Sequence, residues 1–131
     1  MVNPKLRSRN IAKKSGKILW SKKCKNIVIL DVSKMTSLCD YFVIATVESN
    51  IQMRTAIDTL TTELKKSGYY QLFREQSMKY DSPYWKTLDY GDVIIHIMSK
   101  QARDFYSLEK IWHKAKTIKF LPTRKTKKTK K

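Results

Sequence analysis

Hydrophobic and polar residues along the chain follow patterns that predict eight secondary-structure elements. Residues 6–24 form a lysine-rich stretch with apolar side chains on one side, which predicts an amphipathic helix. Two short apolar runs follow at residues 26–31 and 40–47, and their length and composition are typical of buried strands. The second run is apolar on both faces, which favours a central position in a sheet. A polar connection at residues 33–39 separates the two runs.

The next element carries the clearest helix signals in the sequence. Ser49 and Gln52 have the spacing of a capping box, in which side chains satisfy free backbone N–H groups at a helix start. Lys65 and Lys66 are favourable near the negative end of a helix dipole, and Gly68 can adopt the left-handed conformation that ends a helix. The buried face predicted for this helix consists of residues at helical spacing, namely Met53, Ala56, Ile57, Leu60 and Leu64.

The second half of the chain contains three predicted strands and a final helix. Residues 69–75 form the first of these strands. Residues 84–88 and 93–98 are predicted to pair as a hairpin around the turn 89–92, in which Gly91 suits a positive φ. The last helix, over residues 100–115, is predicted to bury Phe105, Leu108, Ile111, Trp112 and Ala115.

This order of elements predicts an α/β fold of the α+β-like kind, with a mixed sheet of about five strands packed against helices. The eight-residue link between the first two strands allows them to be antiparallel neighbours. The helical crossover from residues 40–47 to residues 69–75 favours a right-handed parallel connection. A single domain is predicted for residues 1–116. Residues 117–131 end in a Lys/Thr run without core-forming side chains and are predicted to be a disordered basic tail.

The formal charge of +17 is concentrated at the two ends of the chain. Residues 1–25 contain nine Lys and Arg residues and no acidic residue, and residues 117–131 contain seven and none. Residues 26–116 hold all eleven acidic residues among twelve basic ones and are close to neutral. Two basic arms suit a phosphate-rich nucleic acid, because each phosphate contact releases a counterion. The alternative interpretation is that the basic arms only keep the protein soluble. The sequence leaves both interpretations open.

Several function classes find no support in the sequence. No apolar run approaches the ~18 residues of a membrane span and no signal-peptide core follows the basic N-terminus, so the expected location is the cytoplasm. With three glycines in the whole chain, Gly-rich phosphate loops are excluded. The two histidines and two cysteines show no metal-ligand spacing, and the cysteines are expected to stay reduced. Asp89 and Asp92 suit either a shared divalent ion or Asx hydrogen bonds within a turn, and the second role is the more common.

Aromatic and charged side chains gather around the predicted hairpin and last helix. Tryptophan and tyrosine combine a large apolar area with a polar tip, and arginine offers a rigid set of donors, so these types dominate binding hot spots. Trp85 and Tyr106 are equally acceptable as core residues, and composition alone does not decide between the two interpretations. The cluster consists of Tyr84, Trp85, Asp89, Tyr90, Asp92, Arg103 and Tyr106.

Residues 85–96 have the sequence WKTLDYGDVIIH, and residues 103–112 have the sequence RDFYSLEKIW. This order closely resembles the signature of the ribosomal silencing factor family, also known as Iojap. That signature is a tryptophan, an L/V-D-x-G-D turn, an apolar run with a histidine, then R-x-x-Y-x-L-E and L/I-W. The predicted strands at residues 27–32 and 40–44 match the first two strands of the family, and the resemblance extends over roughly residues 6–115.

The resemblance implies a nucleotidyltransferase-like topology. The chain lacks the Gly-Ser and paired D-x-D metal ligands of that superfamily, so neither enzymatic activity nor a cofactor is implied. Family members resemble binders of the L-fourteen-type protein on the intersubunit face of the large ribosomal subunit. Occupying that face blocks subunit joining and represses translation when nutrients are scarce. Organellar relatives assist large-subunit assembly, and relatives suggest a homodimer for the free protein.

The resemblance also implies site residues. Trp85 matches the exposed contact tryptophan of the family, and the turn 89–92 matches an adjoining acidic turn that suits a basic ribosomal protein surface. The predicted partner-binding residues are Trp85, Asp89, Tyr90, Asp92, Arg103 and Tyr106.

The chain departs from the family in two places. Glu75 is followed by Gln76 where the family commonly has Glu-Gly, and the loop to the tryptophan is longer. The basic tail extends beyond the usual end of the family and suggests a contact with ribosomal RNA. Three alternatives remain beside subunit blocking: a large-subunit assembly factor, a general RNA-binding protein driven by the arms, and a nucleotidyltransferase-like enzyme using Asp31, Asp89 or Asp92.

Overall fold

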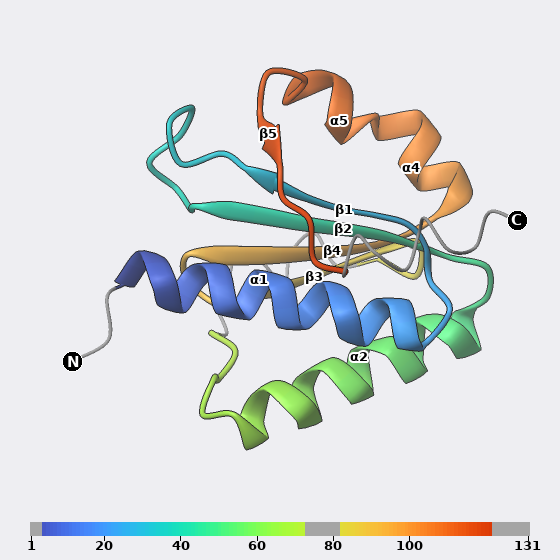
Figure 1. The fold of residues 1–131 in the computed structure, drawn as a ribbon. Coiled ribbons are helices and arrows are strands. Elements are labelled where there is room, and N and C mark those ends of the chain that lie inside the picture. Colours follow the sequence, from blue (N-terminus) through green and yellow to red (C-terminus); the bar gives the residue numbers. More distant parts are fainter. Residues whose placement is uncertain (1–3, 73–81, 122–131) are drawn as a thin grey trace, which may run out of the picture.

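The structure is a computed structural model that describes residues 4–72 and 82–121 of the chain (Figure 1). Helices and strands follow in the order α1 (Pro4–Ser21), β1 (Lys25–Asp31), β2 (Tyr41–Val47), α2 (Asn50–Lys66), β3 (Trp85–Asp89), β4 (Val93–Ser99), α4 (Lys100–Tyr106), α5 (Leu108–Ile111) and β5 (Lys116–Thr117).

The strands form one mixed sheet with the order β3-β4-β2-β1-β5. β1 is antiparallel to β2 and to β5, β2 is parallel to β4, and β3 and β4 form an antiparallel hairpin. This arrangement confirms the predicted mixed five-stranded α+β fold. It also confirms the antiparallel pairing of the first two predicted strands.

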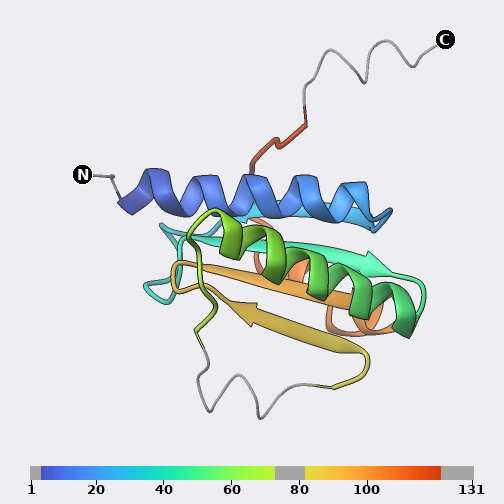
Figure 2. The same cartoon turned by 90° about the horizontal axis from the view of Figure 1, so that it is seen from below.

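Helices cover both faces of the sheet, so the molecule has three layers (Figures 1 and 2). α1 and α2 pack on one face, over a core that includes Val43 and Ala45 of β2. α4 and residues 108–115 lie on the other face, over a smaller core that includes Ile44 and Met98. Because side chains of a strand alternate between faces, the continuous apolar run of β2 supplies both cores.

The predicted capping of α2 by the side chain of Ser49 is confirmed. The backbone N–H of Gln52 donates to Oγ of Ser49 over 3.0 Å, and Oε1 of Gln52 accepts from the backbone N–H of Glu48 over 2.7 Å. Gly68, just beyond the helix, has a φ of +89°, which glycine adopts without strain. The buried residues of the helix are Met53, Ala56, Leu60 and Leu64, with Ile57 partly buried against them.

The strand predicted at residues 69–75 is wrong for residues 69–72, and residues 73–81 lie outside the described part of the chain. The short segment after α2 lies beside the hairpin without strand pairing, and Leu72 donates its N–H to the carbonyl of Asp89 over 2.7 Å. The parallel partner of β2 is therefore β4 and not the segment after α2. The parallel crossover was correctly expected, but its second strand was misplaced.

The helix predicted over residues 100–115 is interrupted at Ser107, which has a φ of +47°. The break turns the following residues away from the axis of α4. Phe105 and Ile111 were predicted to be buried but are 80% and 64% exposed. Leu108, Trp112 and Ala115 do pack against the smaller core, as predicted.

The chain after Lys116 continues along the sheet. Thr117 pairs with Leu30, and Ile118 donates its N–H to the carbonyl of Ile29 over 2.9 Å. Phe120 then packs against the larger core beside α1. The strand β5 was not predicted, because two residues carry no recognisable pattern. The division at residue 116 stays a prediction, and most of the predicted disordered tail lies outside the described residues.

Candidate partner-binding groove between β3 and α4

A groove of about 640 Å³ lies between the edge strand β3 and the helix α4. Its walls are mainly aromatic, with polar side chains at the margin. We call it the aromatic groove, and the residues that line it are Ser82, Tyr84, Trp85, Thr87, Ser99, Gln101, Ala102, Phe105 and Tyr106.

The groove exists because α4 is short and begins immediately after β4. Oγ of Ser99 caps the helix by accepting from the N–H of Ala102 over 3.1 Å. Trp85, at the start of β3, lies opposite Met98 at the end of β4. The helix therefore leaves the sheet at the end of the hairpin where the tryptophan stands, and the edge strand is only partly covered.

The aromatic side chains of the groove contact one another yet stay open to solvent. The ring centroids of Trp85 and Tyr106 are 4.6 Å apart, and those of Phe105 and Tyr106 are 4.9 Å apart in an edge-to-face contact. Phe105 is 80% exposed, Tyr84 59% and Tyr106 48%. Exposed aromatic side chains gathered in one concave place are typical of a protein-binding surface.

Trp85 is half-buried, whereas the resemblance implies a fully exposed tryptophan. Its indole N–H donates to Nδ1 of His96 over 3.0 Å, and part of the ring packs against the smaller core. The same side chain lines the groove. Trp85 is therefore both a core residue and a groove residue, which resolves the alternatives left open by the sequence.

His96 holds the indole in place. Because its Nδ1 accepts a hydrogen bond, the neutral ring must carry its proton on Nε2, a tautomer assigned from the bonding pattern. Nε2 has no hydrogen-bond partner among the described residues, and Phe42 contacts the ring edge-to-face at 5.0 Å. Burial lowers the pKa of His96 to about 4, so the side chain is neutral at pH 7.

Arg103, a predicted contact residue, is buried and does not line the groove. Its Nη1 donates to Oγ1 of Thr46 over 2.9 Å, and its Nε donates to Oε2 of Glu109 over 3.0 Å. Burial raises the pKa of Glu109, but the hydrogen bond and the charge of Arg103 outweigh burial, so the pKa lies below its usual value. This ion pair ties α4 and α5 to β2 and so holds Tyr106 in position.

The predicted acidic turn lies at the far end of the hairpin from Trp85. Asp89 is four residues further along β3, which corresponds to about 14 Å. Asp89 is buried, and its Oδ1 accepts from the N–H of Gly91 over 2.8 Å, the Asx turn that the sequence allowed. Tyr90 is buried in the larger core, where burial raises its pKa to about 12, and only Asp92 is exposed.

The structure thus separates the predicted site residues into two groups. Trp85 and Tyr106 meet in the groove, while Asp89, Tyr90 and Arg103 are buried supports. The structure adds Phe105, which the sequence reasoning placed in the core. The adjacent pair Phe105-Tyr106 on one short helix was the available signal, since neighbouring helical residues point in different directions and rarely share one core.

The described residues contain no group of three or more His, Cys, Asp or Glu side chains that could hold a metal ion. This includes Asp31, Asp89 and Asp92, the carboxylates of the enzymatic alternative. In the part of the chain that the structure describes, no helix has the length and hydropathy needed to cross a membrane.

Comparison with known proteins identifies the family. The family model described as "Ribosomal silencing factor during starvation" matches residues 5–131. The chain belongs to the ribosomal silencing factor family. A protein named ribosomal silencing factor from Chromobacterium violaceum is 34% identical over 104 residues, which are 79% of this chain and 83% of the relative.

Other ribosomal silencing factors agree with this assignment. The one from Haemophilus influenzae is 38% identical over 87 residues, covering 66% of this chain and 82% of its own. The chloroplast Iojap protein of Zea mays is 32% identical over 73% of this chain, but the match spans 40% of that longer protein. The predicted resemblance is therefore confirmed.

Solved structures show the same fold. A crystal structure of a Chromobacterium violaceum protein superposes with a TM-score of 0.72 at 33% identity, over 81% of this chain and 86% of the other. One from Bacillus halodurans gives a TM-score of 0.68 over 85% and 98% of the two chains. At 23% identity, the second likeness supports the fold alone.

Proposed function

We propose that this ribosomal silencing factor is a cytoplasmic translational repressor that docks on the large ribosomal subunit through its L-fourteen-type protein. The bulk of the domain then keeps the small subunit from joining. The observation that carries the proposal is the aromatic groove, in which three exposed aromatic side chains surround the partly buried Trp85. Family membership supports it, because the relatives carry the name of ribosomal silencing factors.

The groove has the composition of a binding hot spot. Trp85 is fixed by its bond to His96 and by its contact with Tyr106, so little side-chain entropy is lost when a partner binds. An apolar side chain of the partner can fill the groove, and polar residues such as Gln101 can form the rim. To keep the small subunit away, the bound domain needs only to occupy part of the surface where the two subunits join. Neither a cofactor nor a chemical step is part of this proposal.

The remaining predicted residues have other places in the proposal. Asp92 is exposed at the far end of the hairpin and does not line the groove, so it has no direct part in this docking. Asp89, Tyr90 and Arg103 act indirectly, by holding the turn and the helix. The basic arms of the chain are proposed to contact ribosomal RNA.

Phe105→Ala is the sharpest test of the groove, because the exposed ring can be removed without opening the core. Co-sedimentation with purified large subunits should show affinity reduced by about 30-fold, the equivalent of a hot-spot loss of about 2 kcal/mol. Trp85→Ala should weaken binding at least as much. It also removes a core contact, so its unfolding curve must be measured alongside.

Ile111→Ala is the matched control, since Ile111 is a large exposed apolar residue that does not line the groove. It should bind large subunits as the parent chain does. Equal binding by all three variants would refute the assignment of the groove as the docking surface.

Sucrose gradients separate blocking from assembly. Added protein should migrate with free large subunits and reduce the joined-ribosome peak, and Phe105→Ala should do so less. Recovery only with immature large subunits, and no loss of joined ribosomes, would instead support the assembly-factor alternative.

A further inference from the structure

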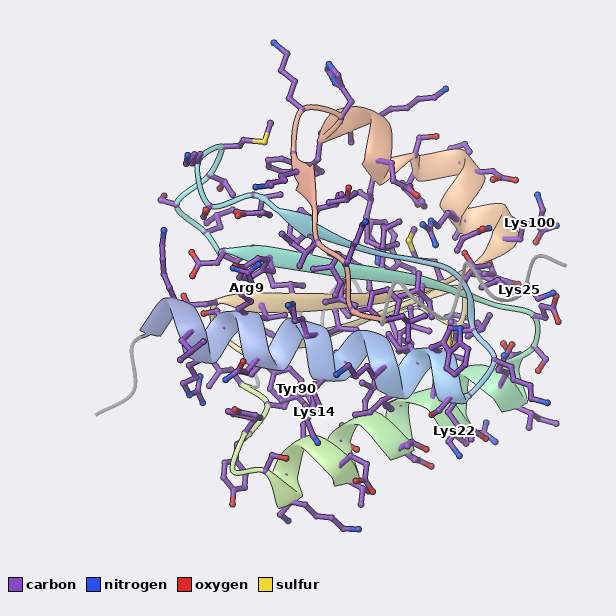
Figure 3. All side chains as sticks on the ribbon, in the orientation of Figure 1. Arg9, Lys14, Lys22, Lys25, Tyr90 and Lys100 are labelled. Atoms are coloured by element: carbon purple, nitrogen blue, oxygen red, sulfur yellow. The ribbon has the colours of Figure 1, made fainter. Side chains whose placement is uncertain are left out.

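A line of basic side chains runs along one side of α1. Lys5, Arg9, Lys13 and Lys17 recur every four residues, a spacing that puts neighbours on one side of a helix. Lys13 is half-buried and the other three are exposed. We call these four residues the basic stripe. Figure 3 shows Arg9 on one flank of α1 and Lys14 on the other, toward α2, so both flanks of the helix carry positive charge.

Lys5 interacts electrostatically with Asp31 of β1, whose pKa its charge helps to lower, but within the helix itself the stripe is unfavourable. Three like-charged pairs at a spacing of four residues destabilise a helix, by roughly 0.2–0.5 kcal/mol per pair. Residues 1–25 contain no acidic residue that could offset them within the helix. The opposite side of α1, with Ile11, Ala12 and Leu19, is buried in the larger core. Repulsion between these like charges lowers the stability of the free protein. Binding of an anionic partner would neutralise the charges and remove the repulsion.

The C-terminal segment is fixed beside the same helix. The hydrogen bond from Ile118 to Ile29 aligns the segment, and the ring of Phe120 lies over Gly16. A Cβ at Gly16 would come within 2.9 Å of that ring, so only glycine allows Phe120 to approach α1 this closely.

Two sequence-distant basic regions therefore lie together. Lys116 and Lys119 are exposed on the fixed segment. The last described residues leave beside α1, on the side away from the sheet (Figure 2). The sequence after residue 121 adds six Lys and Arg residues and no acid.

We propose that the basic stripe and the fixed C-terminal segment form one binding surface for the sugar-phosphate backbone of RNA. This inference rests on the RNA contact proposed above and names the residues that form it. Lysine and arginine side chains bind phosphates without reading sequence. Trp20, which is 57% exposed and three residues beyond the stripe, offers a ring on which a base can stack.

The surface is separate from the aromatic groove. α1 lies on one face of the sheet and α4 on the other (Figures 1 and 2). The chain can therefore hold RNA on one face while a protein fills the groove on the other. An anionic membrane fits less well, because the apolar side of α1 is buried in the core and cannot enter a bilayer surface.

The test is the binding of the whole chain to a fluorescent uridine homopolymer over a range of salt concentrations. The triple variant Arg9→Gln, Lys13→Gln and Lys17→Gln should bind roughly 10- to 100-fold more weakly at low salt. The slope of log affinity against log salt should fall by about 2, because each phosphate contact on a single strand contributes about 0.7. The unfolding midpoint of the triple variant should not decrease, because the substitutions remove charge repulsion within α1.

The matched control removes three charges elsewhere: Lys65→Gln, Lys66→Gln and Lys110→Gln. It should bind RNA nearly as the parent chain does. Phe120→Ala should weaken binding by releasing the C-terminal segment from α1.

Equal losses in the stripe and control variants would overturn the proposal in favour of net charge alone. Unchanged RNA binding by the stripe variant, or tight binding of the parent chain to anionic vesicles but not to RNA, would also overturn it. Phe105→Ala should keep full RNA binding. Failure of this surface is therefore distinguishable from failure of the groove.

Discussion

The Glu109→Ala variant should unfold with a free energy about 3 kcal/mol below that of the parent chain. The side chain of Arg103 is 8% exposed and pairs with Glu109. Removing the carboxylate leaves a buried guanidinium that cannot lose its proton, and Thr46 accepts only one of its donors. This loss of free energy should lie at the lower end of the range for breaking a buried ion pair, because the Glu109 side chain is itself 41% exposed. Urea unfolding at neutral pH measures it.

A second substitution should restore much of this stability. Arg103→Met in the Glu109→Ala background removes the buried charge and keeps most of the volume, so the double variant should be more stable than Glu109→Ala alone. Lys110→Ala changes an exposed neighbour on α5 and should shift the free energy by less than ~0.5 kcal/mol. A loss in Glu109→Ala no larger than in Lys110→Ala would show that the ion pair does not hold this part of the fold.

This ion pair also bears on the groove. Arg103 and Tyr106 belong to the same turn of α4, and Glu109 follows the left-handed Ser107. When the pair is broken, the end of α4 loses its tie to β2, and Tyr106 loses its fixed position beside Trp85. Glu109→Ala should therefore weaken docking on large subunits although Glu109 does not line the groove.

The sequence predicted those elements whose signals are local and repeated. α2 has a cap at Ser49, a regular apolar face and Gly68 at its end, and the structure agrees with each. The hairpin of β3 and β4 has two apolar strands around Gly91, which has the expected positive φ of +89°. In these places local propensity and tertiary packing favour the same structure.

The misplaced elements depend on long-range contacts. Ser107 breaks the predicted last helix, yet serine carries no strong signal for a left-handed conformation. Arg103, just before the break, is held by its hydrogen bond to Thr46 of β2, which is 57 residues away in sequence. Likewise, β5 exists because the edge of β1 accepts it, which no pattern in two residues reveals.

The candidate site was predicted in part, for the same reason. Trp85 and Tyr106 were correctly grouped, but the acidic turn was placed beside them because the family resemblance implies an adjoining turn. In a strand, four residues span about 14 Å, so sequence neighbours at the two ends of β3 do not share a site. Burial of Tyr90 depends on α1 and α2, which come from the first half of the chain.

The last expected result concerns pH: the fold should lose about 3 kcal/mol of stability as pH falls from about 6.5 to 4, because of His96. In the unfolded chain His96 has its ordinary pKa of 6.5, whereas burial lowers the pKa to about 4 in the folded state. Between these values the unfolded chain binds the extra proton, so acid favours unfolding. The stability is fully present above pH 6.5 and is lost as pH falls toward 4.

Urea unfolding of His96→Asn across this range provides the test. Asparagine keeps an acceptor near the Nδ1 position, so the indole N–H of Trp85 can stay bonded, but asparagine does not titrate. The variant should be less stable at neutral pH, because the smaller side chain leaves a cavity, and nearly independent of pH between about 6.5 and 4.5. His113→Asn, at an exposed histidine, should keep the pH dependence of the parent chain. If His96→Asn kept the slope of the parent chain, His96 would not be the source of the pH dependence.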